Sequence, residues 1–204
     1  MQLPLPLRRA LRRPDALPVQ DSRLLRRKLG HWFDCLDGDR DGRLTRHDFE
    51  AAAERTADRF RVHGDSRDGR LLHQRFSALW SAAGLGAGAA VDREAFTEQL
   101  IVSLRDRRRA LHAVNALACI LADLADLDGD GEVTEDEYIG LLAAAFHLRS
   151  TPDLRLSFER LDRNHNGVLE HDEIHQAVVE YFSSSDPEAR GNWLLGPAPL
   201  RPSA

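Results

Sequence analysis

The sequence of 204 residues has little of what several classes of protein require. Its two cysteines, Cys35 and Cys119, are too few for a disulfide framework and lack the spacing of metal ligands, so we expect packed thiols in a reducing compartment. No run of about 18 apolar residues is present, and no transmembrane helix is therefore expected. Prolines and arginines interrupt the first 20 residues, so no secretory signal is expected either. The predicted location is cytoplasmic.

An excess of basic charge is also missing. The formal net charge is −5, which gives no global attraction to nucleic acid, and no nucleic-acid partner is predicted. Hydrophobic residues make up 42% of the chain, enough to bury a core in one compact domain or in two small lobes.

One segment, residues 126–137, has the sequence D-L-D-G-D-G-E-V-T-E-D-E. Carboxylates at its positions 1, 3 and 5 can converge on one side of a tight turn, the glycine at position 6 permits the bend, and the glutamate at position 12 can close the shell with two oxygens. This is the pattern of an EF-hand calcium loop, in which position 7 contributes a backbone carbonyl. The predicted ligands are Asp126, Asp128, Asp130, Glu132 through its carbonyl, and Glu137.

The same pattern occurs in two further segments, residues 37–48 and 162–173. In the first, the predicted ligands are Asp37, Asp39, Asp41, Arg43 through its carbonyl, and Asp48. In the second, they are Asp162, Asn164, Asn166, Val168 through its carbonyl, and Glu173. Three Ca²⁺ sites are therefore predicted. Mg²⁺ is an alternative ion, mainly in the first loop, because Asp48 is one methylene shorter than glutamate and favours the six-fold geometry that Mg²⁺ tolerates.

Helical periodicity on both sides of these loops suggests four helix–loop–helix hands. We expect a disordered Arg/Pro-rich head over residues 1–20, a first pair of hands over 21–109, a second pair over 110–182, and an apolar tail over 183–204. The second hand, with its loop at 84–95 and an entering helix at 71–83, is predicted to be structural only. Its positions 1, 3, 5 and 12 carry no side-chain oxygen, being Gly84, Gly86, Gly88 and Ala95. The segment 64–75 is interpreted as a linker between helices.

Residues 21–182 resemble the sarcoplasmic calcium-binding protein group, and its prokaryotic, calerythrin-like members most closely. The resemblance rests on F-D-x-x-D-x-D-x-D-G at 33–42, on Asp48 at the end of the first loop, on the oxygen-poor second hand, and on the intact third and fourth hands. It implies a compact globule of paired hands that binds Ca²⁺ or Mg²⁺ at three sites and often serves as a buffer. The head and the tail that contains Trp193 depart from this group.

The predicted fold class is all-α, with four EF-hands in two pairs that form a compact globule and with short β bridges between paired loops. The predicted function is a monomeric Ca²⁺ buffer. The alternative is a sensor that exposes a groove to a protein partner when it binds Ca²⁺. Met1 is the only methionine, so the flexible methionine-rich groove of promiscuous sensors is missing, which favours the buffer. A third hypothesis places the arginines of the head on anionic lipid.

No enzymatic site is predicted. His171 and His175 lie in H-D-E-I-H, which superficially resembles the zinc-protease motif H-E-x-x-H. Asp172 occupies the place of the catalytic glutamate, and Glu173 is already assigned to the fourth loop. We therefore do not assign protease activity to this segment.

Overall fold

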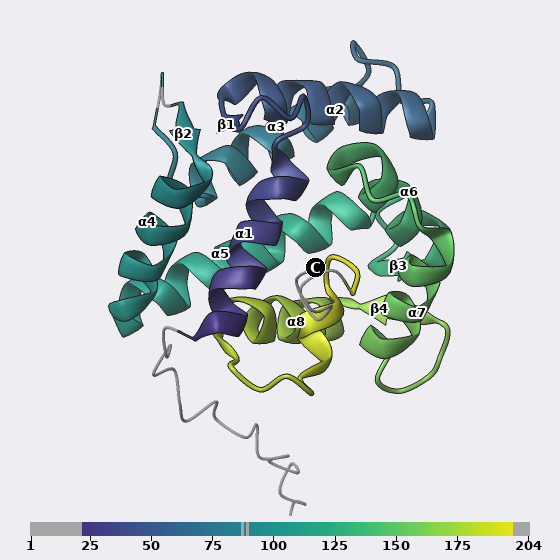
Figure 1. Cartoon of the computed structure of the whole chain (residues 1–204). Helices are drawn as coiled ribbons and strands as arrows, with labels where there is room; N and C mark the ends of the chain where they lie inside the picture. Colours follow the sequence, from purple (N-terminus) through teal and green to yellow (C-terminus); the bar gives the residue numbers. More distant parts are fainter. Residues whose placement is uncertain (1–21, 87, 89, 198–204) are drawn as a thin grey trace, which may run out of the picture.

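The computed structural model describes residues 22–86, 88 and 90–197, and the predicted head over 1–20 lies outside this part of the chain (Figure 1). The helices and strands in chain order are α1 (Arg23–Leu36), β1 (Arg43–Leu44), α2 (Arg46–Phe60), α3 (Arg67–Ala82), β2 (Val91–Asp92), α4 (Arg93–Arg105), α5 (Arg107–Ala125), β3 (Glu132–Thr134), α6 (Glu135–Phe146), α7 (Thr151–Leu161), β4 (Val168–Glu170), α8 (His171–Ser183) and the 3₁₀ helix η1 (Arg190–Trp193). None of the described helices combines the length and the apolarity that a membrane crossing requires.

Four helix–loop–helix hands are formed by α1–α2, α3–α4, α5–α6 and α7–α8, and the loops pair in twos. Strand β1 runs antiparallel to β2 with Leu44 opposite Val91. Strand β3 runs antiparallel to β4 with Val133 opposite Leu169. These four residues stand at position 8 of their loops. The all-α fold with two pairs of EF-hands and loop–loop bridges is thereby confirmed.

Three helix boundaries are set by side chains that bond to nearby backbone. Ser22 caps α1 by accepting from the N–H of Leu25 at 3.1 Å. Ser66 accepts from the N–H of Gly69 at 3.0 Å, so α3 begins at Arg67, inside the segment that was expected to be a linker. Asp106 accepts from the N–H of Arg108 at 3.1 Å and adopts an extended conformation, which separates α4 from α5.

The two pairs of hands share one core. The indole of Trp32 in α1 lies 5.6 Å from the ring of Phe146 in α6 and 6.0 Å from the ring of Phe182 in α8. Arg55 in α2 donates to two backbone carbonyls near the end of α6, at 2.9 and 3.2 Å. Gly140 permits the close approach of α2 and α6, because a Cβ at this position would lie 2.5 Å from the ring of Phe60.

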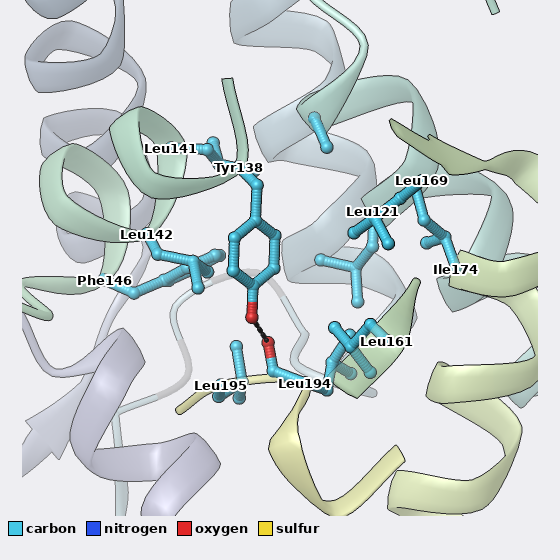
Figure 2. A pocket seen from close by; sticks show the side chains of 11 residues that line it. Leu121, Tyr138, Leu141, Leu142, Phe146, Leu161, Leu169, Ile174, Leu194 and Leu195 are labelled. Atoms are coloured by element: carbon cyan, nitrogen blue, oxygen red, sulfur yellow. Dashed lines mark hydrogen bonds between the residues drawn. The ribbon is translucent and has the colours of Figure 1, made fainter. Parts of the chain in front are cut away.

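The chain beyond α8 folds back over the second pair of hands. Leu194 and Leu195 are buried, and their side chains point into the same apolar interior as those of α5, α6 and α8 (Figure 2). The hydroxyl of Tyr138 in α6 donates to the carbonyl of Leu194 at 3.1 Å. The remaining cavity has a volume of only about 30 Å³. The tail is therefore part of the core of this pair.

Lys28, the only lysine in the sequence, is fully buried where α1 meets the end of α8. Its Nζ donates to the carbonyls of Glu180 and Ser184, at 3.1 and 2.7 Å, and to Oδ1 of Asn192 in η1 at 3.1 Å. Burial lowers the pKa of Lys28 to about 8, against the opposing attraction of Glu180. A single ammonium group thus joins α1, α8 and the returning tail.

Candidate metal centres

Glycine at position 6 bends each of the three predicted loops. Gly42, Gly131 and Gly167 have φ values of +82°, +90° and +88°. No neighbouring atom lies within 4 Å of a Cβ built at these positions, so the left-handed backbone, not crowding, requires glycine. Immediately after the bend, the position-7 residues Arg43, Glu132 and Val168 begin strands β1, β3 and β4.

The first loop gathers carboxylates around one buried oxygen without a partner. Ligand atoms of Asp37, Asp39 and Asp48 all lie within 4.8 Å of one another. Oδ2 of Asp37 accepts from the N–H of Gly42 at 3.0 Å, whereas its Oδ1 is buried and has no hydrogen-bond partner. Burial raises the pKa of Asp37, and the neighbouring carboxylates raise it further. A divalent cation would coordinate the unpartnered Oδ1 of Asp37 and offset the repulsion between the neighbouring carboxylates, so these residues fit a hard metal ion. Asp41 is not part of this close group, and its Oδ1 accepts from the N–H of Arg43 at 2.7 Å.

The third loop brings a second acidic group together. Ligand atoms of Asp126, Asp128 and Asp130 lie within 4.8 Å of one another. Asp126 accepts from the N–H groups of Gly129 and Gly131, at 2.8 and 3.1 Å, which folds the loop around its side chain. Three carboxylates at this separation repel one another unless a cation lies among them. This donor set also fits Ca²⁺.

The fourth loop has the same backbone arrangement with fewer charges. Asp162 is buried and accepts from the N–H groups of His165 and Gly167, at 2.6 and 2.9 Å. The Oδ1 atoms of Asn164 and Asn166 accept from backbone N–H groups two residues further on, at 2.9 and 3.1 Å. Two amide oxygens thus occupy the places that carboxylates have in the third loop.

The acid at position 12 is held in the same way in all three loops. Asp48, Glu137 and Glu173 each accept with one oxygen from the N–H of loop position 2, at 3.2, 3.2 and 2.7 Å. The other oxygen accepts from the N–H of position 9, at 2.8, 2.9 and 3.1 Å. The shorter Asp48 therefore spans the same two backbone groups as the glutamates. In each loop the closing carboxylate is positioned by the fold itself.

The second hand uses its acidic residue for a different purpose. Asp92, at position 9 of the loop, caps α4 by accepting from the N–H of Ala95 at 2.9 Å. The loop still supplies β2, which pairs with β1 of the first loop. The hand therefore supports its neighbour through the strand pair.

Two features of the loops were not predicted from the sequence. The hydroxyls of Thr45 and Thr134, both at loop position 9, donate to the closing carboxylates at 3.0 and 2.7 Å. Position 4 is left-handed in all three loops, as Arg40, Gly129 and His165 have φ values of +61°, +79° and +59°. Only the glycine in the third loop gave a signal for this conformation.

Comparisons with known proteins agree with this arrangement. A family model described as EF hand matches residues 29–52 and 154–179, and one described as EF-hand domain pair matches residues 87–145. Calerythrin from Saccharopolyspora erythraea is 28% identical over 167 residues, which span 78% of this chain and 93% of calerythrin.

Two solved structures extend the comparison. The coelenterazine-binding protein from Renilla muelleri, in its calcium-loaded apo form, has a TM-score of 0.72 at 25% identity, covering 87% of this chain and 99% of its own. A Streptomyces coelicolor calcium-binding protein, described in connection with prokaryotic calcium-mediated regulation, has a TM-score of 0.61 at 28% identity, covering 78% of this chain and 97% of its own.

Proposed function

Since the chain belongs to the EF-hand family and is a calcium-binding protein similar to calerythrin, we propose that it is a Ca²⁺ buffer with three ion sites, in its first, third and fourth loops. The residues that would hold the ions are Asp37, Asp39, Asp41, Asp48 and the carbonyl of Arg43 in the first loop, Asp126, Asp128, Asp130, Glu137 and the carbonyl of Glu132 in the third, and Asp162, Asn164, Asn166, Glu173 and the carbonyl of Val168 in the fourth. The shared hydrogen bonds of the three closing carboxylates support this assignment.

The three sites differ in the ion that they favour. The third loop has four carboxylate ligands, as many as the first, and closes with a glutamate at position 12, which suits the seven-fold coordination of Ca²⁺. The fourth loop keeps the glutamate but has two asparagines, so both the repulsion without an ion and the attraction for one are weaker. The first loop ends in Asp48, whose shorter arm favours one coordinating oxygen and tolerates Mg²⁺.

The observation that carries the buffer proposal is the tail in the core of the second pair. In an EF-hand sensor, ion binding opens a groove that accepts a partner helix. Here the apolar faces of α5, α6 and α8 are already covered by Leu194 and Leu195, and Lys28 fixes the same tail to α1 and α8. A pair whose groove is filled from within the same chain has no free surface of this kind to offer.

Binding of a small organic molecule in the second pair of hands is less well supported than ion binding. One structural relative is named for coelenterazine binding. Pockets for drug-sized ligands measure about 300–1,000 Å³, whereas the cavity next to Tyr138 measures about 30 Å³. We therefore favour ion binding as the function of this pair.

Calorimetric titration of the chelator-treated full chain with Ca²⁺ tests the three sites. Three bound ions are expected, and Asp48→Asn, Glu137→Gln and Glu173→Gln should each remove one or weaken it strongly. Asp92→Asn is the matched control, because asparagine caps a helix as well as aspartate does and the second hand has no assigned ion. A count of fewer than three in the unmodified protein, or loss of an ion in the control, would contradict the assignment.

A sensor is the second candidate, because a second groove, of about 460 Å³, lies mainly between α3, α4 and α5. Its lining includes Val102, which is 59% exposed. The Streptomyces relative, described in connection with calcium-mediated regulation, also favours this reading. Fluorescence of an apolar dye separates the two functions: a buffer should give the same signal with and without Ca²⁺, and a sensor should give a several-fold rise with Ca²⁺.

A further inference from the structure

Two histidines at the start of α8 are not used by the ion loops. His171 is exposed and His175 half-buried, and their rings are nearly parallel, with centroids 6.5 Å apart and an interplanar angle of 21°. Residues four apart lie one above the other on the same face of a helix, and a histidine pair with this spacing can hold one metal ion through two imidazole nitrogens. The segment H-D-E-I-H has aspartate where the protease motif has the glutamate that acts as a base, but it keeps both histidines that can bind a metal ion.

A thiol, that of Cys119, is carried by α5, the helix that packs against α8. Helices α5 and α8 run in opposite directions (Figure 1): Ile174 lies with Leu121 toward one end, and Phe182 lies with Val114 toward the other. The side chains of His175 and Asn115 meet across the two helices, with Nε2 of the imidazole 3.0 Å from Oδ1 of the amide.

The antiparallel arrangement extends this contact by one turn. Cys119 stands four residues after Asn115 along α5, and His171 stands four residues before His175 along α8. Both steps cover about 6 Å along their helices in the same direction in space. This register would bring Cys119 to the level of His171 across the two helices. The sequence suggested a packed thiol, but Cys119 is exposed and free.

We propose that His171, His175 and Cys119 form a site for Zn²⁺ that is separate from the Ca²⁺ loops. Two imidazole nitrogens and one thiolate, with water as the fourth ligand, are a donor set that Zn²⁺ prefers and that hard cations such as Ca²⁺ do not. The thiol releases its proton to solvent when the ion binds. The three side chains do not converge in this structure, and binding requires the ring of His175 to leave Asn115, which is an exposed contact between side chains that can rotate.

A second histidine–cysteine pair shows why exposure decides the choice. His31 and Cys35 are also four apart on one helix, with Nε2 3.6 Å from Sγ. Cys35 is only 2% exposed, and burial raises the pKa of its thiol well above the usual value. The ring of His31 is engaged with the carbonyl of Leu195 at 2.8 Å. Cys119 is thus the thiol that a metal ion can reach, and Cys35 is an internal reference that reacts only if the protein unfolds.

Alkylation of Cys119 tests the proposal in the full, untagged chain. The protein is kept saturated with Ca²⁺, so that the loops are filled, and is treated with iodoacetamide with and without one equivalent of Zn²⁺. Mass spectrometry then follows Cys119 and Cys35 separately. We expect Zn²⁺ to slow the alkylation of Cys119 at least tenfold, while Cys35 stays unmodified.

The variants make the test specific. The protection should disappear in a double variant with His171→Gln and His175→Gln, and should persist in His112→Gln, which removes another exposed histidine from α5. Calorimetry should show one Zn²⁺ site whose affinity falls at least tenfold in the double variant and in Cys119→Ser. Equal alkylation rates with and without Zn²⁺, or protection that survives in the double variant, would overturn the proposal and leave the Ca²⁺ assignment untouched.

Discussion

The buried ammonium group of Lys28 should make the stability of the protein depend on pH in a predictable direction. In the folded protein its pKa is about 8, below the ordinary value of 10.5, because burial disfavours the charged form. Between these two values the unfolded chain binds more protons at this residue than the folded chain does. The free energy of unfolding should therefore rise with pH through this window. Below about pH 8 both states are protonated, and the full cost of burying the charge is present.

The size of the effect follows from the two pKa values. Their difference of about 2.5 corresponds to about 3 kcal/mol over the whole window, at about 1.4 kcal/mol per unit. Between pH 8 and 9.5 the gain that Lys28 contributes is about 1.5 kcal/mol. Cys35 opposes it by about 1 kcal/mol, because its thiol ionises near the ordinary pKa of 9.0 in the unfolded chain, whereas burial raises its pKa in the folded protein. This range ends below the ordinary pKa of tyrosine, near 10, so Tyr138 and Tyr181 contribute little.

Urea unfolding at saturating Ca²⁺ measures this gain. From pH 8 to 9.5 the free energy of unfolding should change by about 1.5 kcal/mol more in the favourable direction in the unmodified protein than in Lys28→Met, because methionine has a similar shape and no charge. The opposing ionisation of Cys35 is common to both proteins and cancels in this difference. Arg23→Gln, an exposed cation on the same helix, is the control and should keep the slope of the unmodified protein. If Lys28→Met and the unmodified protein show the same dependence on pH, then the three oxygen acceptors compensate for burial and the reasoning is wrong.

Three further predictions concern the tail and the first loop. Leu195→Ala should lower the free energy of unfolding by about 2–4 kcal/mol, measured by chemical denaturation, and should raise the binding of an apolar dye without Ca²⁺, measured by fluorescence. Leu156→Ala, at a position that is 39% exposed, is the control and should change both quantities little. Asp48→Glu should increase the preference of the first loop for Ca²⁺ over Mg²⁺, which calorimetry with and without millimolar Mg²⁺ measures. If millimolar Mg²⁺ lowers the Ca²⁺ affinity of the variant as much as that of the unmodified protein, the length of the side chain at position 12 does not matter. Gly191→Ala should destabilise the protein by roughly 1–3 kcal/mol, because its Cβ would lie 2.4 Å from a backbone carbonyl of α8, and thermal unfolding should show no such loss for Gly64→Ala, where nothing lies within 4 Å.

The four hands and their pairing could be predicted because an EF-hand loop is specified locally. All of its constraints fall within twelve residues, and position 8 of each loop already carries the apolar side chain that pairs across the loops. The loop positions of Asp37 and Glu137 thus follow from the sequence without knowledge of the rest of the fold.

The missed features depend on competition or on contacts that are distant in sequence. The start of α3 was placed too late because apolar periodicity begins at Leu71, while the cap that decides the boundary is the hydroxyl of Ser66. The burial of Lys28 was not predicted, since its three acceptors lie more than 150 residues away along the chain. The exposure of Cys119 depends on how α5 packs against α8, which helical periodicity alone did not fix.

The buried tail also sets the free energy that Ca²⁺ binding would have to supply to open the second pair of hands in a sensor. A ligand shifts a conformational equilibrium only by the difference in its affinity for the two states. Exposing the buried side chains of Leu194 and Leu195 costs about 3–6 kcal/mol, before the contacts of Lys28 and Asn192 are counted. Ca²⁺ would then have to bind the open form about 10²- to 10⁴-fold more tightly than the closed one. The closing carboxylates are already held by backbone N–H groups in the closed form, so little of that difference can come from assembling the loops. Ion binding without opening is the outcome that this balance favours.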